Sequence, residues 1–326
     1  MAKGTETTIV DVARQAGVSR QTVTRALNGM KDISPATRER VLLAAQTLHY
    51  RPNRAAQGLV RGRDVTLGLL VEDLRNPYYP ALASELSRQA AALDWGLTLC
   101  DVGQVDEGVP ERLAPLLRRV DVLIGRIPRT VDSLRIPTVL LDGHPDDAAD
   151  AVVVIDHRTG IRRALDHLTE TLGCRHIAMI DQGTEPTERC LAYREYLADH
   201  ELAWTPLSEV RVEDSHDVGV RAATELLTRY CEVDAVLVFN DVLALGALKG
   251  FAHSGTAVPD QVAVIGMDGL DIGALVTPEL TSIAIDRSEL ARQAIALAAD
   301  LLEGRVPAGE RPAPILTPHL LIRDSA

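Results

Sequence analysis

Aromatic residues are scarce in this 326-residue chain: they make up 3% of it, with two Trp and two Phe. Stacking surfaces for a base or a sugar are therefore few. Cysteine is also rare, and Cys100, Cys174, Cys190 and Cys231 lack the close pairing of a metal site. We expect them to be free thiols in or near the core.

Long apolar runs are missing too. No stretch of about 18 uncharged apolar residues predicts a membrane span. The N-terminus lacks the apolar stretch of a signal peptide, which favours the cytoplasm.

Signatures of catalysis are also missing. The chain has no Gly-x-x-x-x-Gly-Lys phosphate loop, no Gly-x-Ser-x-Gly elbow and no cluster of metal ligands. His144, His157 and His216 have no evident nucleophile or paired base nearby, so we expect solvent-exposed polar roles for them. We therefore expect neither an enzyme nor a bound cofactor or metal.

Positive charge, in contrast, is concentrated at one end of the chain. Residues 1–63 hold 11 Lys and Arg against 4 Asp and Glu, a net charge of +7, whereas the whole chain carries −12. The remaining residues therefore carry −19. An acidic chain with one basic segment is typical of a protein that places this segment on a polyanion.

The basic segment also has the pattern of short helices joined by a tight turn. Thr8 with Asp11 resembles a capping pair and predicts a helix start, and Gly17 predicts its end. Ser19 predicts the N-cap of a second helix, which Asn28-Gly29 ends. This is the arrangement of a helix-turn-helix motif.

The second helix of such a motif enters the major groove of DNA. Its outward side chains suit base edges and phosphates, and they are Arg20, Gln21, Thr22 and Arg25. A third helix starts at Ser34-Pro35 and runs to about His49, and we expect it to pack Val41, Leu42, Ala45 and Leu48 against the other two. The alternative is a helical bundle whose arginines are only solvated, and the concentration of charge argues against it.

From Val65 onward, strand-like runs alternate with helix-like stretches. The strand-like runs are 65–71, 97–102, 120–125, 138–142, 177–180, 235–239 and 262–266. The helix-like stretches include 80–93, 160–172, 187–200, 218–230, 242–254 and 288–304. This alternation predicts parallel sheets covered by helices, and ligands of such sheets bind beyond the carboxyl ends of the strands.

Several motifs occur along the chain in a fixed order. They are DVARQAGVSRQTVTRALNG at 11–29, Tyr50-Arg51-Pro52-Asn53, Ala56-Gln57-Gly58-Leu59, Asn76-Pro77-Tyr78-Tyr79, Arg189, Asn240-Asp241 with Ala244 and Gly246, Val258-Pro259-Asp260, Gly266-Met267-Asp268, Pro278-Glu279-Leu280-Thr281 and Leu321-Ile322-Arg323-Asp324-Ser325. In these motifs the chain resembles the lac repressor/purine repressor (LacI/GalR) family of bacterial transcriptional regulators over nearly its full length.

The resemblance implies an all-α helix-turn-helix headpiece at 1–52 and a hinge helix or linker at 53–63. It also implies an α/β core at 64–326, like a periplasmic binding protein, with two parallel-sheet subdomains. The expected N-subdomain is about 64–157 and 286–313, and the expected C-subdomain is about 158–284 and 315–324. We expect the chain to cross between them near 156–160, 283–287 and 313–316.

The resemblance also implies which residues contact DNA. In the family the hinge becomes helical only on the operator, and its leucine enters the minor groove; here that leucine is Leu59, with Ala56 one turn earlier. A plain flexible linker is the alternative. The expected DNA contacts are Thr8, Ser19, Arg20, Gln21, Thr22, Arg25, Asn28, Asn53, Ala56 and Leu59.

Polar residues near the strand ends are the expected effector contacts: Asp73, Tyr78, Tyr79, Asp142, Arg189, Asp214, Asn240 and Asp268. Arg189, Asn240 and Asp268 match family positions that hold the effector, although Asn240-Asp241 also suits a helix cap. Many relatives have an aromatic residue where Asp214 stands, so Tyr78 and Tyr79 are the remaining candidates for stacking. A cleft that is acidic and short of aromatics is expected.

The function that these residues imply is effector-switched DNA binding, most simply repression. The expected effector is a sugar or sugar derivative, and the alternative is a nucleoside, a polyol or a cationic metabolite. The alternative to a repressor is an effector-dependent activator or a co-repressed regulator. The expected partner is a pseudo-palindromic double-stranded DNA operator in the bacterial cytoplasm, where the bound protein would be nucleoid-associated. A periplasmic solute-binding protein, the rival for 64–326 alone, would need a signal peptide.

We expect a homodimer formed through helix 80–93 and its neighbours. The chain ends at Ala326 with no heptad-bearing extension, so a tetramer zippered through its tail is not expected.

Overall fold

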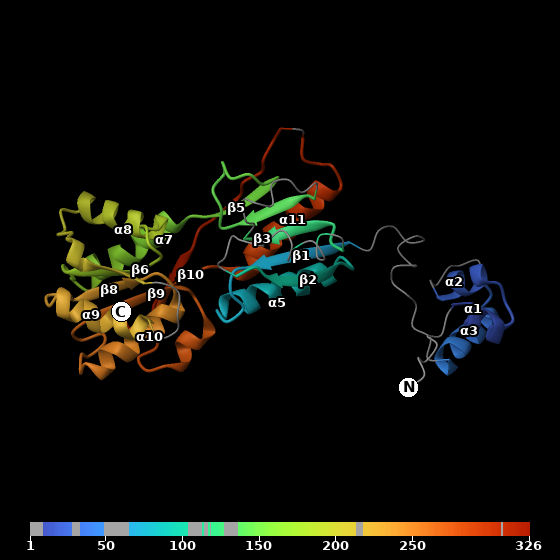
Figure 1. Ribbon diagram of the computed structural model, residues 1–326, viewed down its shortest axis with the longest axis horizontal. Coiled ribbons are helices and arrows are strands. Elements are labelled where there is room, and N and C mark those ends of the chain that lie inside the picture. The colour runs from blue at the N-terminus through green and yellow to red at the C-terminus, as the bar shows by residue number, and fades with distance from the viewer. Residues whose placement is uncertain are drawn as a thin grey trace. The chain divides into compact units, whose positions relative to one another are not determined.

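The computed structural model describes residues 9–27, 33–48, 65–103, 113, 117, 119–126, 136–212, 218–307 and 309–326. The chain divides into two compact units, Met1–Asp64 and Val65–Ala326 (Figure 1). The expected hinge at 53–63 lies outside the described residues, and so do Thr8, Asn28, Asp214 and His216.

The described part of the first unit consists of α1 (Ile9–Ala16), α2 (Arg20–Leu27) and α3 (Pro35–Thr47). Gly17 adopts φ +64°, a conformation that glycine allows at little cost, and this turns the chain from α1 into α2. The Ser19 hydroxyl accepts a hydrogen bond from the Thr22 N–H at 3.1 Å, as expected of an N-cap. The helix-turn-helix therefore follows from one glycine turn and one serine cap.

An apolar core joins these three helices, with Val12, Val23 and Val41 fully buried. The predicted packing of Leu42 is wrong, because this side chain is 50% exposed. Ala44 is buried instead. The helical period brings positions 41, 44 and 45 to one face of α3 and leaves Leu42 outside.

The second unit holds two subdomains, each built on a twisted sheet (Figure 1). The described strands of the N-subdomain form a six-stranded parallel sheet in the order β11-β5-β4-β3-β1-β2. They are β1 (Thr66–Val71), β2 (Gly96–Asp101), β3 (Val122–Gly125), β4 (Thr138–Leu141), β5 (Ala151–Ile155) and β11 (Ile315–Leu316). The apolar faces of α5 (Tyr78–Ala91) and α11 (Arg287–Leu302) pack together against one side of this sheet.

The described strands of the C-subdomain form a second sheet, in the order β12-β10-β9-β8-β6-β7. They are β6 (Ile177–Gln182), β7 (Glu209–Val212), β8 (Ala235–Val238), β9 (Ala263–Asp268), β10 (Thr281–Ala284) and β12 (His319–Leu321). β12 is antiparallel to β10, and the other pairs are parallel.

Helices cover both faces of the second sheet (Figure 1). α9 (Val218–Arg229) and α10 (Asp241–His253) bury their apolar sides against one face, and α7 (His157–Asp166) and α8 (Glu188–Asp199) bury theirs against the other. A π-helical turn, η2 (His167–Thr171), continues α7, and the 3-10 turns η3 (Pro206–Ser208) and η4 (Asp271–Leu275) precede β7 and follow β9. A sheet covered on both faces explains why its strands are almost continuously apolar.

Within the described residues, the chain passes between the subdomains from β5 to α7, from β10 to α11 and from β11 to β12. The last passage was predicted near 313–316 and the last C-subdomain segment at about 315–324, and the start of that segment is wrong. Ile315 and Leu316 pair with Val154 and Ile155 of β5 in the first sheet. This pairing keeps them in the N-subdomain, so the chain crosses after Leu316.

Cys174, Cys190 and Cys231 are free thiols, as predicted, but Cys231 does not lie in or near the core. Cys174 and Cys190 are buried and Cys100 is half-buried, whereas Cys231 is exposed in the turn between α9 and β8. Among the residues that the structure describes, none of the helices has the length and apolar character needed to cross a bilayer.

Candidate functional site

A cavity of about 650 Å³ lies where the carboxyl ends of the two sheets meet. Seven of the eight predicted effector residues line it: Asp73, Tyr78, Tyr79, Asp142, Arg189, Asn240 and Asp268. The eighth, Asp214, is outside the described residues. The strand ends therefore bring together residues that are up to 195 positions apart in the sequence (Asp73 to Asp268).

Asp142, at the end of β4, is contacted from both subdomains. Its Oδ1 lies 2.6 Å from His157 Nε2 and its Oδ2 lies 3.7 Å from Arg189 Nη2. Its backbone carbonyl accepts a hydrogen bond of 3.0 Å from Arg126. Burial alone would raise the pKa of Asp142, but these three neighbours outweigh it and lower the pKa to about 2. An ionised carboxylate thus joins the two walls of the cavity.

The predicted solvent-exposed role of His157 is wrong, since this residue is only 7% exposed. His157 is the first residue of α7, which begins directly after the chain crosses from β5. The short crossing holds the imidazole against Asp142, a position that no sequence motif indicates. His144 is exposed, as predicted.

Arg189 lies on the first turn of α8, and its side chain is only 11% exposed. Its Nη1 donates to the Phe239 carbonyl at 2.6 Å, and its guanidinium carbon lies 4.3 Å from the centroid of the Phe239 ring. Stacking on the ring and the bond to the carbonyl hold the guanidinium in one plane. Phe239 also lines the cavity, and it was not predicted as a ligand contact.

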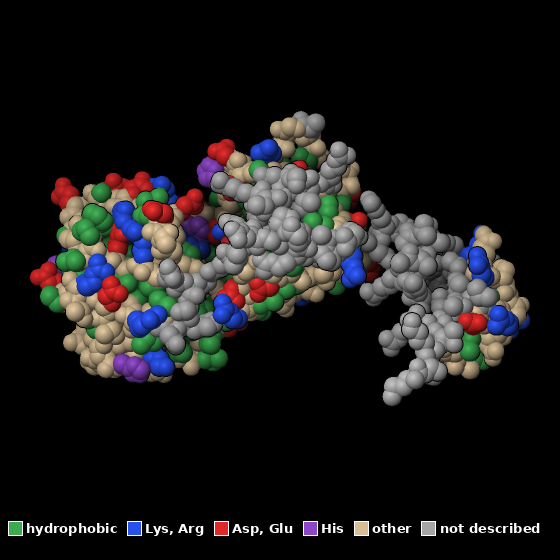
Figure 2. All heavy atoms as spheres, in the orientation of Figure 1, with side chains coloured by type: hydrophobic (Ala, Val, Ile, Leu, Met, Phe, Trp, Pro, Cys, Tyr) green, Lys and Arg blue, Asp and Glu red, His purple; other side chains and the backbone are tan. Residues whose placement is uncertain are grey.

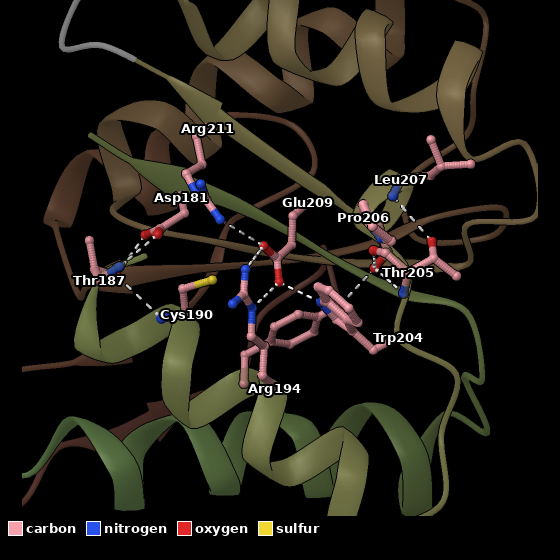
Figure 3. Close-up of polar contacts among 12 residues, drawn as sticks. Asp181, Thr187, Cys190, Arg194, Trp204, Thr205, Pro206, Leu207, Glu209 and Arg211 are labelled. Atoms are coloured by element: carbon pink, nitrogen blue, oxygen red, sulfur yellow. Dashed lines mark hydrogen bonds and ion pairs between the residues drawn. The ribbon is translucent and has the colours of Figure 1, made fainter. Parts of the chain in front are cut away.

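A buried contact at the start of α8 fixes where this helix begins and thereby positions Arg189 (Figure 3). Asp181, the fully buried carboxylate near the end of β6, accepts hydrogen bonds from the Thr187 N–H at 3.0 Å and the Thr187 hydroxyl at 2.6 Å. The Thr187 hydroxyl in turn accepts from the Cys190 N–H at 3.3 Å and caps the helix. Asp181 is therefore a positioning residue for Arg189.

The middle of α8 is held to the edge strand β7 by a second polar cluster (Figure 3). The Glu209 carboxylate, 5% exposed, accepts from Arg194 Nε and from the Trp204 indole, each at 2.6 Å. Arg194 Nη2 also donates to it, and the Arg194 guanidinium lies over the Trp204 ring at 5.0 Å. The helix that carries Arg189 is therefore attached to the sheet by charge-assisted bonds.

Asn240 follows β8, and Asp268 is the last residue of the neighbouring strand β9. Asn240 Oδ1 accepts the Leu243 N–H at 2.8 Å, so its expected role as a helix cap is confirmed. Its amide nitrogen has no acceptor among the described residues. Asp268 is 5% exposed, and burial, together with the carboxylates of Asp241 and Asp142, raises its pKa well above the usual range, although Arg189 opposes the rise. Hydroxyl donors on a ligand would stabilise its ionised form.

The N-subdomain wall holds a polar group that the sequence analysis found only in part. Arg126 Nε donates to Glu72 Oε1 at 3.1 Å, and the Tyr79 hydroxyl donates to Glu72 Oε2 at 2.8 Å. Only Tyr79 was predicted. β1 and β3 are neighbours, with Leu70 opposite Gly125, so residues just past their ends lie side by side. Glu72 and Arg126 are the first residues after β1 and β3, so both stand at strand ends, where a ligand site is expected.

The other predicted residues on this wall have defined roles. Asp73 accepts hydrogen bonds from the Arg75 N–H and guanidinium, so its carboxylate holds the loop after β1. The Tyr78 and Tyr79 rings meet edge to face with centroids 5.5 Å apart. Burial, helped by the carboxylates of Asp142 and Asp268, raises the pKa of Tyr78, so its hydroxyl stays neutral.

The described lining of the cavity is acidic, as predicted, and it holds one aromatic ring more than predicted. Its ionisable lining consists of Glu72, Asp73, Asp142 and Asp268 against Arg126 and Arg189. Phe239 adds a third ring to those of Tyr78 and Tyr79, and Gln182 and Thr187 add polar groups from the C-subdomain. Hydrogen-bond donors, acceptors and aromatic rings all line the cavity, and this combination suits a small hydroxylated molecule.

The headpiece presents the predicted recognition residues on α2. Arg20, Gln21 and Arg25 are exposed. The hydroxyls of Ser19 and Thr22, 2.9 Å apart, bond to each other at the start of the helix. Basic side chains lie on the face of this unit that Figure 2 shows.

A helix-turn-helix unit, followed by two parallel-sheet subdomains with a polar cavity between them, defines a class: DNA-binding regulators with a small-molecule site. Residues 8–53 match the family model "Bacterial regulatory proteins, lacI family", and residues 165–326 match the "Periplasmic binding protein-like domain". The chain belongs to the lacI family of bacterial regulatory proteins. The family predicted from the sequence is thus confirmed.

Relatives of known function agree with this assignment. The chain is 32% identical to the HTH-type transcriptional regulator CelR of Thermobifida fusca over 98% of both chains. It is also 32% identical to the ribose operon repressor of Halalkalibacterium halodurans over 85% of each. The protein is a transcriptional regulator and not an enzyme, as predicted.

Solved structures share its architecture. The complex of the transcriptional regulator CelR with cellobiose superposes with a TM-score of 0.72 at 30% identity, covering 98% of this chain and 100% of the other. The lac repressor dimer bound to operator and the anti-inducer ONPF gives a TM-score of 0.84 at 26% identity, covering 98% and 99%. The predicted combination of a helix-turn-helix headpiece and a core like a periplasmic binding protein is confirmed.

Proposed function

We propose that the cavity between the two subdomains binds a small hydroxylated effector, a sugar or sugar derivative, and that this binding changes the affinity of the headpiece for an operator. The observation that carries the proposal is the convergence of Arg189, Asn240 and Asp268 with Asp142 and Tyr78 on one cavity. Arginine donates in a planar fork, aspartate accepts, and an amide nitrogen donates, which suits neighbouring hydroxyl groups.

The coupling acts through the position of one subdomain relative to the other. Asp142 belongs to the N-subdomain, and its partners His157 and Arg189 belong to the C-subdomain. A ligand hydroxyl that binds Asp142 or Arg189 competes with this contact and changes how the two walls meet. An effector shifts the regulator only by its difference in affinity for the two arrangements.

The DNA partner follows from the headpiece. We propose that a homodimer, associating through α5 and its neighbours, places two copies of α2 in successive major grooves of a pseudo-palindromic operator, with Asn53, Ala56 and Leu59 at its centre. Thr8, Ser19, Arg20, Gln21, Thr22, Arg25 and Asn28 make the remaining contacts. We propose that the protein represses transcription and that the effector relieves this repression. The protein would act in the bacterial cytoplasm and lie on the nucleoid when bound to the operator.

Substitutions on α2 test the DNA-binding part of the proposal. An operator is first selected from a random double-stranded DNA library. We expect Arg20→Ala or Gln21→Ala to cost about 1–3 kcal/mol of operator affinity and to relax base preference at one position of each half-site. Fluorescence anisotropy with the selected DNA and its single-base variants measures both effects.

Arg175→Ala, at an exposed residue of the C-subdomain, is the control and should bind the operator like the wild type. A uniform loss of affinity over all sequences would mean that Arg20 and Gln21 contact only phosphates. Unchanged affinity would remove α2 from the DNA interface.

A further inference from the structure

The two relatives compared above leave the size of the effector open. The ribose operon repressor and CelR, which forms a complex with cellobiose, are equally identical to this chain, at 32%. One name points to a monosaccharide and the other to a disaccharide. The cavity itself, with its volume and the grouping of its polar residues, is therefore the better guide.

The volume favours two sugar rings. A water molecule occupies ~30 Å³ of liquid, so a hexose of about twelve heavy atoms, each about half that size, displaces on the order of 200 Å³. The cavity measures about 650 Å³. One hexose would leave more than half of this space to water, whereas two, on the order of 400 Å³, would fill more than half of it.

The polar residues form two groups, one on each wall. The C-subdomain wall offers Arg189, Asn240 and Asp268. The N-subdomain wall offers the hydrogen-bonded set of Glu72, Tyr79 and Arg126. Asp142 lies between the groups, since its carbonyl accepts from Arg126 and its carboxylate faces Arg189.

The N-subdomain set is arranged to receive a ligand rather than only to pair with itself. Both oxygens of Glu72 are bonded, one to Arg126 and one to Tyr79, so this carboxylate mainly orients the other two side chains. Among the described residues, Arg126 donates only through Nε to Glu72 and through Nη1 to the Asp142 carbonyl. An arginine has five N–H donors, and its side chain here is 44% exposed in the cavity wall, which leaves donors for ligand oxygens.

We propose that Glu72, Tyr79 and Arg126 form a second sugar subsite, that the effector is a neutral disaccharide, and that Arg126 determines this specificity. The inference rests on the proposed function, because it takes the cavity as the effector site. Glu72 neutralises the charge of Arg126, so the subsite favours the hydroxyl and glycosidic oxygens of an uncharged ring. The first ring binds Arg189, Asn240 and Asp268, and the second binds Arg126.

Isothermal titration of the full-length chain with cellobiose, lactose, glucose, galactose and ribose tests the inference. We expect wild type to bind a disaccharide at least about tenfold more tightly than its component monosaccharides, and Arg126→Ala to remove most of this advantage, since tenfold corresponds to 1.4 kcal/mol, one to two hydrogen bonds. Monosaccharide affinity should change by less than about threefold, or ~0.7 kcal/mol. Tyr79→Phe, which removes only a hydroxyl, should weaken the disaccharide in the same direction.

The matched control is Arg305→Ala, which breaks an exposed ion pair with Asp300 outside the cavity lining and should bind both sugars like the wild type. Equal affinity of wild type for mono- and disaccharides, or an equal loss of both in Arg126→Ala and Tyr79→Phe, would overturn the second subsite and leave the proposed function standing. If wild type binds none of these sugars while still binding the selected operator, the sugar-effector proposal is contradicted, and the second subsite with it.

Discussion

Arg189→Ala is expected to abolish the effect of a cavity ligand on operator binding. The operator affinity of the ligand-free protein should stay within about twofold of wild type, because α2 is untouched and the shorter Asp142–His157 contact still joins the two subdomains. The guanidinium is fixed by the Phe239 carbonyl and ring and faces Asp142 across the cavity. Its removal deletes a charged hydrogen-bond donor from an enclosed site, which costs about 2–4 kcal/mol of ligand affinity, or 30- to several-hundredfold.

The measurement is operator anisotropy with and without a saturating sugar, beside isothermal titration of the sugar. Arg189→Lys keeps the charge but loses the planar fork and the stacking, and it should restore little of the affinity. Arg175→Ala is the surface control. A normal sugar response in Arg189→Ala would remove this residue from the site.

Arg194→Met is expected to lower the free energy of unfolding by about 2–3 kcal/mol, because it leaves the buried Glu209 without its main partner. This is less than the ~3–5 kcal/mol typical of breaking a buried pair, since Arg194 is 29% exposed and Arg211 and Trp204 still contact the carboxylate. Urea denaturation followed by circular dichroism measures the change. Arg229→Met, which breaks a surface pair with Glu225, should change stability by less than about 1 kcal/mol.

The loss should also depend on pH. Burial opposes ionisation of Glu209, but the bonds from Arg194 and Trp204 outweigh it and lower the pKa of Glu209 in the folded state. A lowered pKa stabilises the fold above the unfolded value of about 4.3, and this contribution disappears as pH falls through the folded value. The difference between Arg194→Met and wild type should therefore be largest near neutral pH and shrink in acid. A difference that is constant with pH would contradict this account of the cluster.

Much of the fold was predictable because its elements are long and periodic. Helices such as α8 and α11 carry caps and apolar faces that show in the sequence, and the central strands are short apolar runs between polar turns. The predicted strand-like runs do not include β5, β7, β10, β11 and β12, of which β5 and β10 lie inside their sheets. β11 has two residues and β12 has three, so their pairing depends on the rest of the sheet and not on a pattern of their own.

The site was predictable where a residue ends a strand, and less so where geometry decides. Asp142 and Asp268 follow from the strand-end argument, and both line the cavity. The contact of His157 with Asp142 depends on the short crossing from β5, and that of Arg126 with Glu72 depends on the neighbouring positions of β1 and β3. Predicting which side chains from two separate segments will contact each other requires the register of the sheet, and the sequence alone does not give this register.

Coupling between the cavity and the headpiece is tested by measuring sugar affinity and operator affinity on the same protein. The affinity of the protein for the sugar is measured once without DNA and once with the selected operator bound. The affinity for the operator is then measured without the sugar and with a saturating concentration of it. Coupling is reciprocal, so we expect the operator to change the sugar affinity by the same factor by which the sugar changes the operator affinity. This factor is about 5- to 150-fold for typical allosteric proteins. If the sugar binds the cavity equally well in the presence and absence of operator, the cavity and the headpiece are not coupled.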